Sequence, residues 1–193
     1  MIDLAITITT FSMMVMLFKY FDKIRVNNLI AITFNYFTAG TLALSSYLLE
    51  NSFIELKTNT NLNLVIIALI IGTLFVITFN LYAYSAQKIG ITLSTISNKM
   101  SMVIPILIGI ILFKEEVTFF KIIGIFLALG AIVFSSKEDK KSKKLSQLNI
   151  IILFLLFIGQ GLADGLLNWG QRNILNSQNM NLFFTLTFLS AGF

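Results

Sequence analysis

The stretch 64-LVIIALIIGTLFVITFNLYAYSA-86 decides the fold class, because it runs from Leu64 to Ala86 without a charged side chain. A helix needs about 20 mostly apolar residues to cross the hydrocarbon core of a bilayer, and this stretch is long enough. Lipid offers the backbone no hydrogen-bond partner, whereas a helix satisfies its own backbone groups internally. The stretch therefore predicts a membrane-spanning helix.

Apolar runs of similar length recur along the chain and predict further spanning helices. With the first, they cover Leu4 to Tyr20, Leu29 to Leu49, Leu64 to Ala86, Ile91 to Phe113, Val117 to Ser136 and Leu148 to Trp169. A seventh run starts at Met180 and stops at Phe193, which is too short for a crossing. We predict an all-α integral membrane protein, a polytopic helix bundle of six full spans and a partial seventh, C-terminally truncated.

Composition supports this class and excludes others. Of 193 residues, 56% are hydrophobic and only 12% are charged, against about 25% charged in a soluble domain. The chain has no cysteine and no histidine, so disulfides, thiolate metal sites and the commonest acid/base group are missing. We therefore expect no enzyme, no cofactor and no metal. Basic residues lie between apolar runs rather than over one exposed face, so we expect no nucleic-acid partner.

The placement of lysine and arginine predicts the orientation. The most charged connection, Lys137 to Lys144 (KEDKKSKK), contains five lysines and is expected in the cytoplasm. Alternate counting from this loop puts nine basic residues on its side of the membrane and four on the other. The count favours an external N-terminus. We expect the inner membrane of a bacterium.

A weak internal repeat suggests how the helices are organised. Aligning Ala39-Gly40 with Ala191-Gly192, at an offset of 152 (191 − 39), pairs apolar residues at most nearby positions. Five predicted helices separate the two segments, so the second copy would have the reverse orientation, as in many transporters. We expect a first five-helix unit at 1–136, a basic linker at 137–147 and the start of a second unit at 148–193. Chance alignment of apolar residues remains the alternative.

The segment SNKMSMVIPILIGIILFKEEVTFFKIIGIFLALGAIVFSS (Ser97 to Ser136) contains a proline and several glycines around a polar turn, FKEEVT. The positions concerned are Pro105, Gly109, Glu115, Thr118, Gly124 and Gly130. This pattern resembles the EamA family of the drug/metabolite transporter superfamily. The resemblance implies ten helices in two inverted halves, and metabolite export. It also implies cytoplasmic termini, in conflict with the charge count.

The sixth predicted helix carries a polar face. Gln160, Asp164, Asn168 and Gln171 recur at spacings of four, four and three residues, so they share one side of the helix. A carboxylate inside a membrane is costly and commonly functional. Asp164 is a candidate proton site or the counter-charge for an amine on the substrate. The alternative is a structural aspartate paired with a neighbouring helix.

The fourth predicted helix contains the second intramembrane charge, Lys99, near the middle of the span. Ser97 and Asn98 lie beside it, and Pro105 would free a backbone carbonyl near Ser101. Such local breaks occur at transporter binding sites. Lys99 is expected either to contact a substrate carboxylate or to form a purely structural salt bridge with Asp164.

Polar residues on two other predicted helices complete the candidate site. Asn80 and Tyr84 follow one face of the third helix, and Asn35 lies midway along the second. Each would ordinarily make an interhelical hydrogen bond. Polar faces on helices three, four and six together predict a wet or ligand-filled cavity.

These features predict a secondary transporter of a small polar metabolite, an amino acid or a related compound, working by alternating access. The expected partners are the lipid bilayer, the small-molecule substrate and protons as the candidate coupling ion. The sequence neither requires nor excludes a homo-oligomer. The alternative is a structural or regulatory membrane subunit that needs a partner.

Overall fold

The computed structural model describes residues 2–50, 60–136, 146–176 and 179–193. Regular structure in these residues is entirely α-helical, and they contain no strand. The helices are α1 (Ile2–Ile24), α2 (Asn28–Glu50), α4 (Leu62–Lys88), α5 (Ile91–Met100), α6 (Val103–Phe113), α7 (Phe119–Ser136), α8 (Gln147–Asn173) and α9 (Met180–Gly192). The predicted all-α fold class is confirmed.

Five stretches of the described chain are long and apolar enough to cross a membrane. They are Asp3–Ile24, Asn28–Leu49, Leu62–Lys88, Ile91–Phe113 and Gln147–Asn173. The predicted run at Met180 is also helical, as α9, but is shorter. Of the predicted basic linker, residues 137–145 lie outside the described part of the structure.

Several helices extend beyond the apolar runs because polar residues cap them. The Asn61 side chain accepts a hydrogen bond from the Asn63 backbone N–H, 2.8 Å away, and so starts α4 earlier than the predicted position at Leu64. The Ser146 hydroxyl accepts from the Asn149 N–H at 3.3 Å and starts α8. Such caps are short polar residues that an apolar pattern does not include.

The predicted span Ile91 to Phe113 keeps its bounds but is divided, and the predicted start of the next helix was wrong. The run Ile91 to Phe113 forms two helices, α5 and α6, separated by a turn at Ser101 and Met102. The next helix, α7, starts at Phe119 rather than at Val117, since Lys114, the residue after α6, has a left-handed conformation with φ of 50°. The chain completes this turn between Lys114 and Phe119 before a helix can resume.

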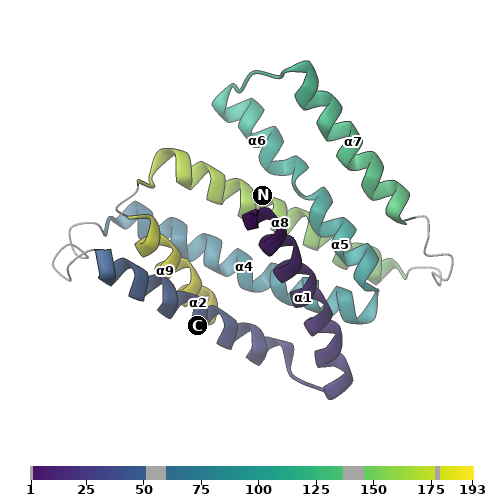
Figure 1. Cartoon of the computed structure of the whole chain (residues 1–193), viewed down its shortest axis with the longest axis horizontal. Helices are drawn as coiled ribbons and strands as arrows, with labels where there is room; N and C mark the ends of the chain where they lie inside the picture. The colour runs from purple at the N-terminus through teal and green to yellow at the C-terminus, as the bar shows by residue number, and fades with distance from the viewer. Residues whose placement is uncertain (1, 51–59, 137–145, 177–178) are drawn as a thin grey trace.

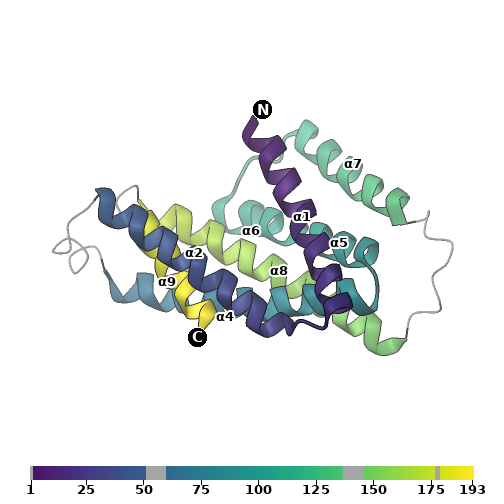
Figure 2. The same ribbon diagram turned by 60° about the horizontal axis from the view of Figure 1, so that its bottom comes forward.

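Helices α2, α4, α8 and α9 form the packed body of the chain, with α9 against both α2 and α4 (Figures 1 and 2). Glycines permit this close approach. A Cβ atom on Gly40 would lie 2.8 Å from the Leu189 side chain, and one on Gly72 would lie 2.6 Å from the Thr187 carbonyl oxygen. The body therefore depends on backbones that nearly touch, as is common in membrane bundles.

Helices α1 and α7 lie at the outside of this body (Figure 2). α1 packs against α4, whereas α7 packs against α5. Val15 and Phe18 of α1 join Tyr82 of α4 in a buried apolar cluster. Most other α1 side chains are exposed in the isolated chain, as expected for a helix that faces lipid.

Polar contacts tie α1, α2 and α4 together at one end of the bundle. The amides of Asn28 and Gln87 donate to each other at 2.8 Å in both directions. Gln87 Nε2 also donates to the Phe18 carbonyl at 2.8 Å, and Lys88 Nζ lies 3.2 Å from Asp22 Oδ1. This is the end at which the charge count places Lys88 and the basic residues of α1.

The opposite end carries a second ion pair. Arg172, in the last turn of α8, pairs with Glu115 in the turn after α6. Its guanidinium carbon also lies 4.5 Å from the centre of the Phe113 ring. The two ion pairs thus lie at opposite ends of the bundle.

Candidate functional site

The break between α5 and α6 is the first element of the candidate site. The Ser101 hydroxyl donates to the Asn98 carbonyl, and the Ile104 N–H donates to the Ser101 carbonyl at 3.0 Å. Pro105 has no N–H to offer that carbonyl, so the regular pattern is interrupted one turn before the proline. The local break predicted near Ser101 is confirmed.

Helix α8 lies close to this broken helix because two glycines of α8 face α6. A Cβ atom on Gly161 would lie 2.8 Å from Ile104 Cβ, and one on Gly165 would lie 2.5 Å from Ile108 Cδ1. The small-residue pair of α8 is therefore a helix contact. This contact positions Asp164, which lies between the two glycines, beside α5 and α6.

Asp164 on α8 and Lys99 on α5 do not form an ion pair, although the two helices pack against each other. Both residues belong to the described chain, and none of its ion pairs joins them. Asp164 Oδ1 accepts a hydrogen bond from Gln160 Nε2 at 3.0 Å, whereas Lys99 Nζ lies 4.0 Å from the centre of the Phe11 ring. Each charge therefore has its own separate partner.

Three other candidates lie on the same two helices. The Ser97 hydroxyl donates to the Leu153 carbonyl and so joins α5 to α8. Asn98 is half-buried on α5, next to Lys99. Asn168, one turn beyond Asp164 on α8, has a buried Oδ1 with no hydrogen-bond partner among the described residues. A buried acceptor of this kind is uncommon and marks a place for a donor.

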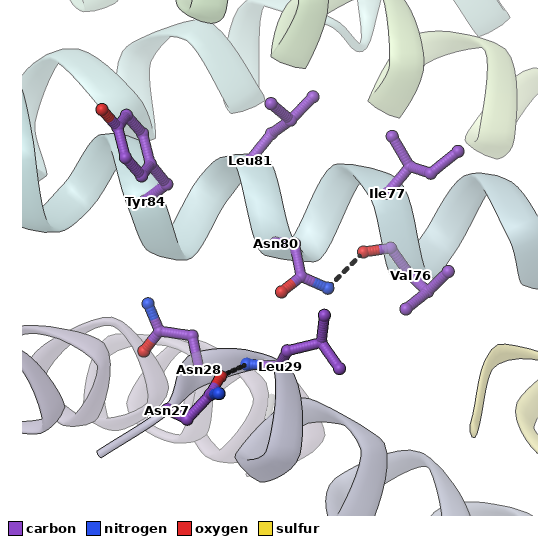
Figure 3. Close-up of a pocket in the computed structure, with 8 residues that line it drawn as sticks. All are labelled: Asn27, Asn28, Leu29, Val76, Ile77, Asn80, Leu81 and Tyr84. Atoms are coloured by element: carbon purple, nitrogen blue, oxygen red, sulfur yellow. Dashed lines mark hydrogen bonds between the residues drawn. The ribbon is translucent and has the colours of Figure 1, made fainter. Parts of the chain in front are cut away.

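Asn80 and Tyr84 lie in a different place. They line an open groove of about 620 Å³ between α4 and the start of α2 (Figure 3). Asn80 points toward α2 and donates to the Val76 carbonyl at 2.8 Å, whereas Tyr84 is 43% exposed. The groove does not include Lys99 or Asp164. The structure thus does not gather these two candidates with the charged pair.

Asn35 is also separate from the charged pair. Its side chain lines a cavity of about 130 Å³ between α1 and α2, with Phe18 and Phe79 in the wall. It also lines an open groove of about 670 Å³ along α1. Apart from Asn35, the cavity is lined by apolar side chains, whereas the groove also includes Thr7 and Thr10.

The chain resembles a known family of membrane proteins. The model of the EamA-like transporter family matches residues 2–137, well over half of the chain. The chain belongs to the EamA-like transporter family. No curated protein matches it, and no solved structure matches it. The predicted family is confirmed.

Membership makes this EamA-like chain a multi-pass membrane protein with a transporter-like function. A transporter handles a small molecule within the bilayer, so the polar groups inside its spans are the ones that could bind it. The described residues contain no group of three or more His, Cys, Asp or Glu side chains able to hold a metal ion.

Sequence reasoning placed Gln160, the partner of Asp164, on the same helix face, but it missed Phe11, the partner of Lys99, in this EamA-like chain. Phe11 lies in an apolar run of α1, where an aromatic ring ordinarily indicates packing or a lipid-facing position. Tyr82 and Thr95 hydrogen-bond through their hydroxyls at 3.0 Å and so link α4 to α5. The polarity of Thr95, one turn before Lys99, was the available signal for this link.

Proposed function

We propose that the chain is a secondary carrier for a small polar metabolite with charged groups, an amino acid or a related compound. The observation that carries the proposal is the pair Lys99 and Asp164. Both lie inside membrane-spanning stretches, and each is held by a partner other than the opposite charge. Charges at this depth are costly, so an open pair of opposite sign is readily explained by a ligand that completes it.

The chemistry of the pair favours a substrate with both a carboxylate and an amine. The Lys99 ammonium offers hydrogen-bond donors to a carboxylate, and the Asp164 carboxylate accepts from an ammonium group. The unpartnered Oδ1 of Asn168, one turn away, adds a second acceptor on the Asp164 side. A zwitterion would satisfy all three groups at once. Export is favoured by the family resemblance.

Alternating access is supported by contacts that recur at the offset of the internal repeat. Gly40 of α2 faces Leu189 of α9, and Gly192 of α9 faces Phe37 of α2. Since 40 + 152 = 192 and 37 + 152 = 189, the two contacts are equivalent under the offset. Such reciprocity is the mark of a two-fold interface. It supports a first unit at 1–136 and the start of an inverted unit at 148–193, joined by the linker 137–147.

A ring contact supports the same symmetry. The rings of Tyr36 and Phe188 stack with centroids 6.2 Å apart, and Phe188 is the equivalent of Tyr36 under the same offset. Residues that contact their own equivalents lie on a two-fold axis. Helices α2 and α9 likewise begin at equivalent positions, Asn28 and Met180.

We assign the end of the bundle that carries Lys88 and Asp22 to the cytoplasm, in the inner membrane of a bacterium. The charge count is the reason, since nine basic residues belong to this end. The coupling ion proposed is a proton, with Asp164 as its acceptor. Gln160 Nε2 donates a hydrogen bond to Asp164 Oδ1, and Lys99 is on the neighbouring helix α5.

The proposal is tested with the chain reconstituted in liposomes. The liposomes are loaded with radiolabelled L-amino acids, one at a time, and contain a pH-sensitive dye. We expect release of at least one amino acid above the level of protein-free liposomes, with proton movement in the opposite direction. Release without any pH change would refute the coupling, and no release of any amino acid would refute the substrate class.

A further inference from the structure

Lys99 does not pair with Asp164, although the two side chains carry opposite charges. A lysine side chain is long and flexible, and opposite charges attract each other. In the structure the ammonium instead lies 4.0 Å from the centre of the Phe11 ring. An ammonium over an aromatic face is attracted by the negative charge of the ring's π-system.

The Phe11 ring is itself held in place by a buried tyrosine. Phe11 of α1 stacks on Tyr82 of α4 with centroids 6.2 Å apart and an interplanar angle of 25°. Tyr82 is 2% exposed, and Phe18 packs edge-on against it at 6.1 Å. The ring that holds Lys99 is therefore part of the packed contact between α1 and α4.

A hydrogen bond links Tyr82 back to α5, the helix that carries Lys99. The Tyr82 hydroxyl and the Thr95 hydroxyl are 3.0 Å apart, and Thr95 precedes Lys99 by one turn of α5. Lys99 thus contacts Phe11, Phe11 stacks on Tyr82, and Tyr82 is hydrogen-bonded to the helix of Lys99. Contacts from three helices thus hold the ring beneath Lys99, whose own side chain is exposed in the isolated chain.

We propose that Phe11 is a positioning residue that holds the Lys99 ammonium over its ring, apart from Asp164, and so keeps a carboxylate-binding site open in the empty carrier. The ring covers one side of the ammonium and leaves its other N–H donors free for a substrate carboxylate. Asp164, held by Gln160, stays available for the amine. Without the ring, Lys99 closes onto Asp164, and a substrate must break that pair to bind. This role rests on the proposed function.

Transport kinetics test the role through the L-amino acid that the wild-type chain carries fastest. Phe11→Leu is expected to raise KM by about twofold to fivefold with a much smaller change in kcat, in line with the strength of a cation–π contact at an exposed lysine. Phe11→Trp keeps an aromatic face and should retain a KM near that of the wild type. Phe126→Leu, on α7 and 70% exposed, is the matched control and should change nothing.

A double variant separates this role from simple packing. In a Lys99→Met background, Phe11→Leu should have no further effect on KM, because no ammonium remains to be held. An equal effect of Phe11→Leu with and without Lys99 would overturn the proposal, and so would an unchanged KM in Phe11→Leu alone.

A fluorescence measurement tests the resting contact when no transport can be measured. Trp169 is the only tryptophan, so Phe11→Trp in a Trp169→Phe background gives a single indole beside Lys99. Adding Lys99→Met should shift its emission, whereas Lys23→Met, at the end of α1, should not. An emission unchanged by Lys99→Met would overturn the proposal. Absence of transport with the shift present would refute the carrier function alone.

Discussion

Asp164→Asn is expected to lower amino acid transport by at least tenfold and to remove its dependence on a pH gradient. The asparagine Oδ1 can still accept from Gln160, so the hydrogen bond within α8 survives. The negative charge and the titratable proton are lost. A hydrogen bond to a charged group contributes about 1.5–3 kcal/mol, and each 1.4 kcal/mol is about a factor of ten.

Liposome flux at two external pH values measures both effects. Asp164→Glu keeps the charge and should retain pH-dependent transport, although at a lower rate. Wild-type flux with Asp164→Asn at both pH values would contradict the role of Asp164. Lys99→Met is the companion change: loss of transport by a folded protein supports a contact with substrate, whereas loss of folded protein supports a structural role.

Gly72→Ala adds one methyl group and is expected to lower the stability of the bundle more than the same change at any other described glycine. The new Cβ would collide with Ser190 Oγ and would lie 2.6 Å from the Thr187 carbonyl oxygen. The hydroxyl can rotate away, but the carbonyl belongs to the backbone of α9, so α4 and α9 must separate. Overpacking of this kind costs about 1–3 kcal/mol.

The melting temperature in detergent, followed by the fluorescence of Trp169, should therefore fall for Gly72→Ala. Gly124→Ala on α7 is the matched control, because nothing lies within 4 Å of the added atom. It should leave the melting temperature unchanged or raise it slightly, since alanine favours helix more than glycine. Adding Ser190→Ala to Gly72→Ala should restore only part of the loss. Equal melting temperatures for the two glycine variants would show that α4 and α9 do not pack this closely.

The apolar runs predicted the helices because the bilayer imposes one requirement on every span. Leu64 to Ala86 carries no charge along its whole length, so a spanning helix is the fold that hides it from water. Helix ends were less predictable. The caps Asn61 and Ser146 and the left-handed Lys114 depend on local hydrogen bonds rather than on hydropathy.

The candidate site was predictable only in part. Spacing places Gln160, Asp164 and Asn168 on one face of α8, but it does not say which helix that face meets. Gly161 and Gly165 pack on α6, and the same packing places α8, which carries Asp164, against α5, which carries Lys99. No spacing rule relates Phe11 to Lys99, because they lie far apart in the sequence and meet only through the packing of α1, α4 and α5.

The chain has no native cysteine, so single introduced thiols test the candidate site most directly. Gln160→Cys puts one thiol beside Asp164, and Leu162→Cys puts one on another face of α8, at a residue that is 42% exposed. A charged, membrane-impermeant methanethiosulfonate reacts with thiolates, which form in water and not in lipid. We predict that Gln160→Cys reacts at least about tenfold faster than Leu162→Cys, since an apolar setting suppresses the thiolate, and that the transported amino acid slows this reaction. Equal, slow reaction at both positions would mean that Lys99 and Asp164 lie in a dry structural contact and not in a substrate site.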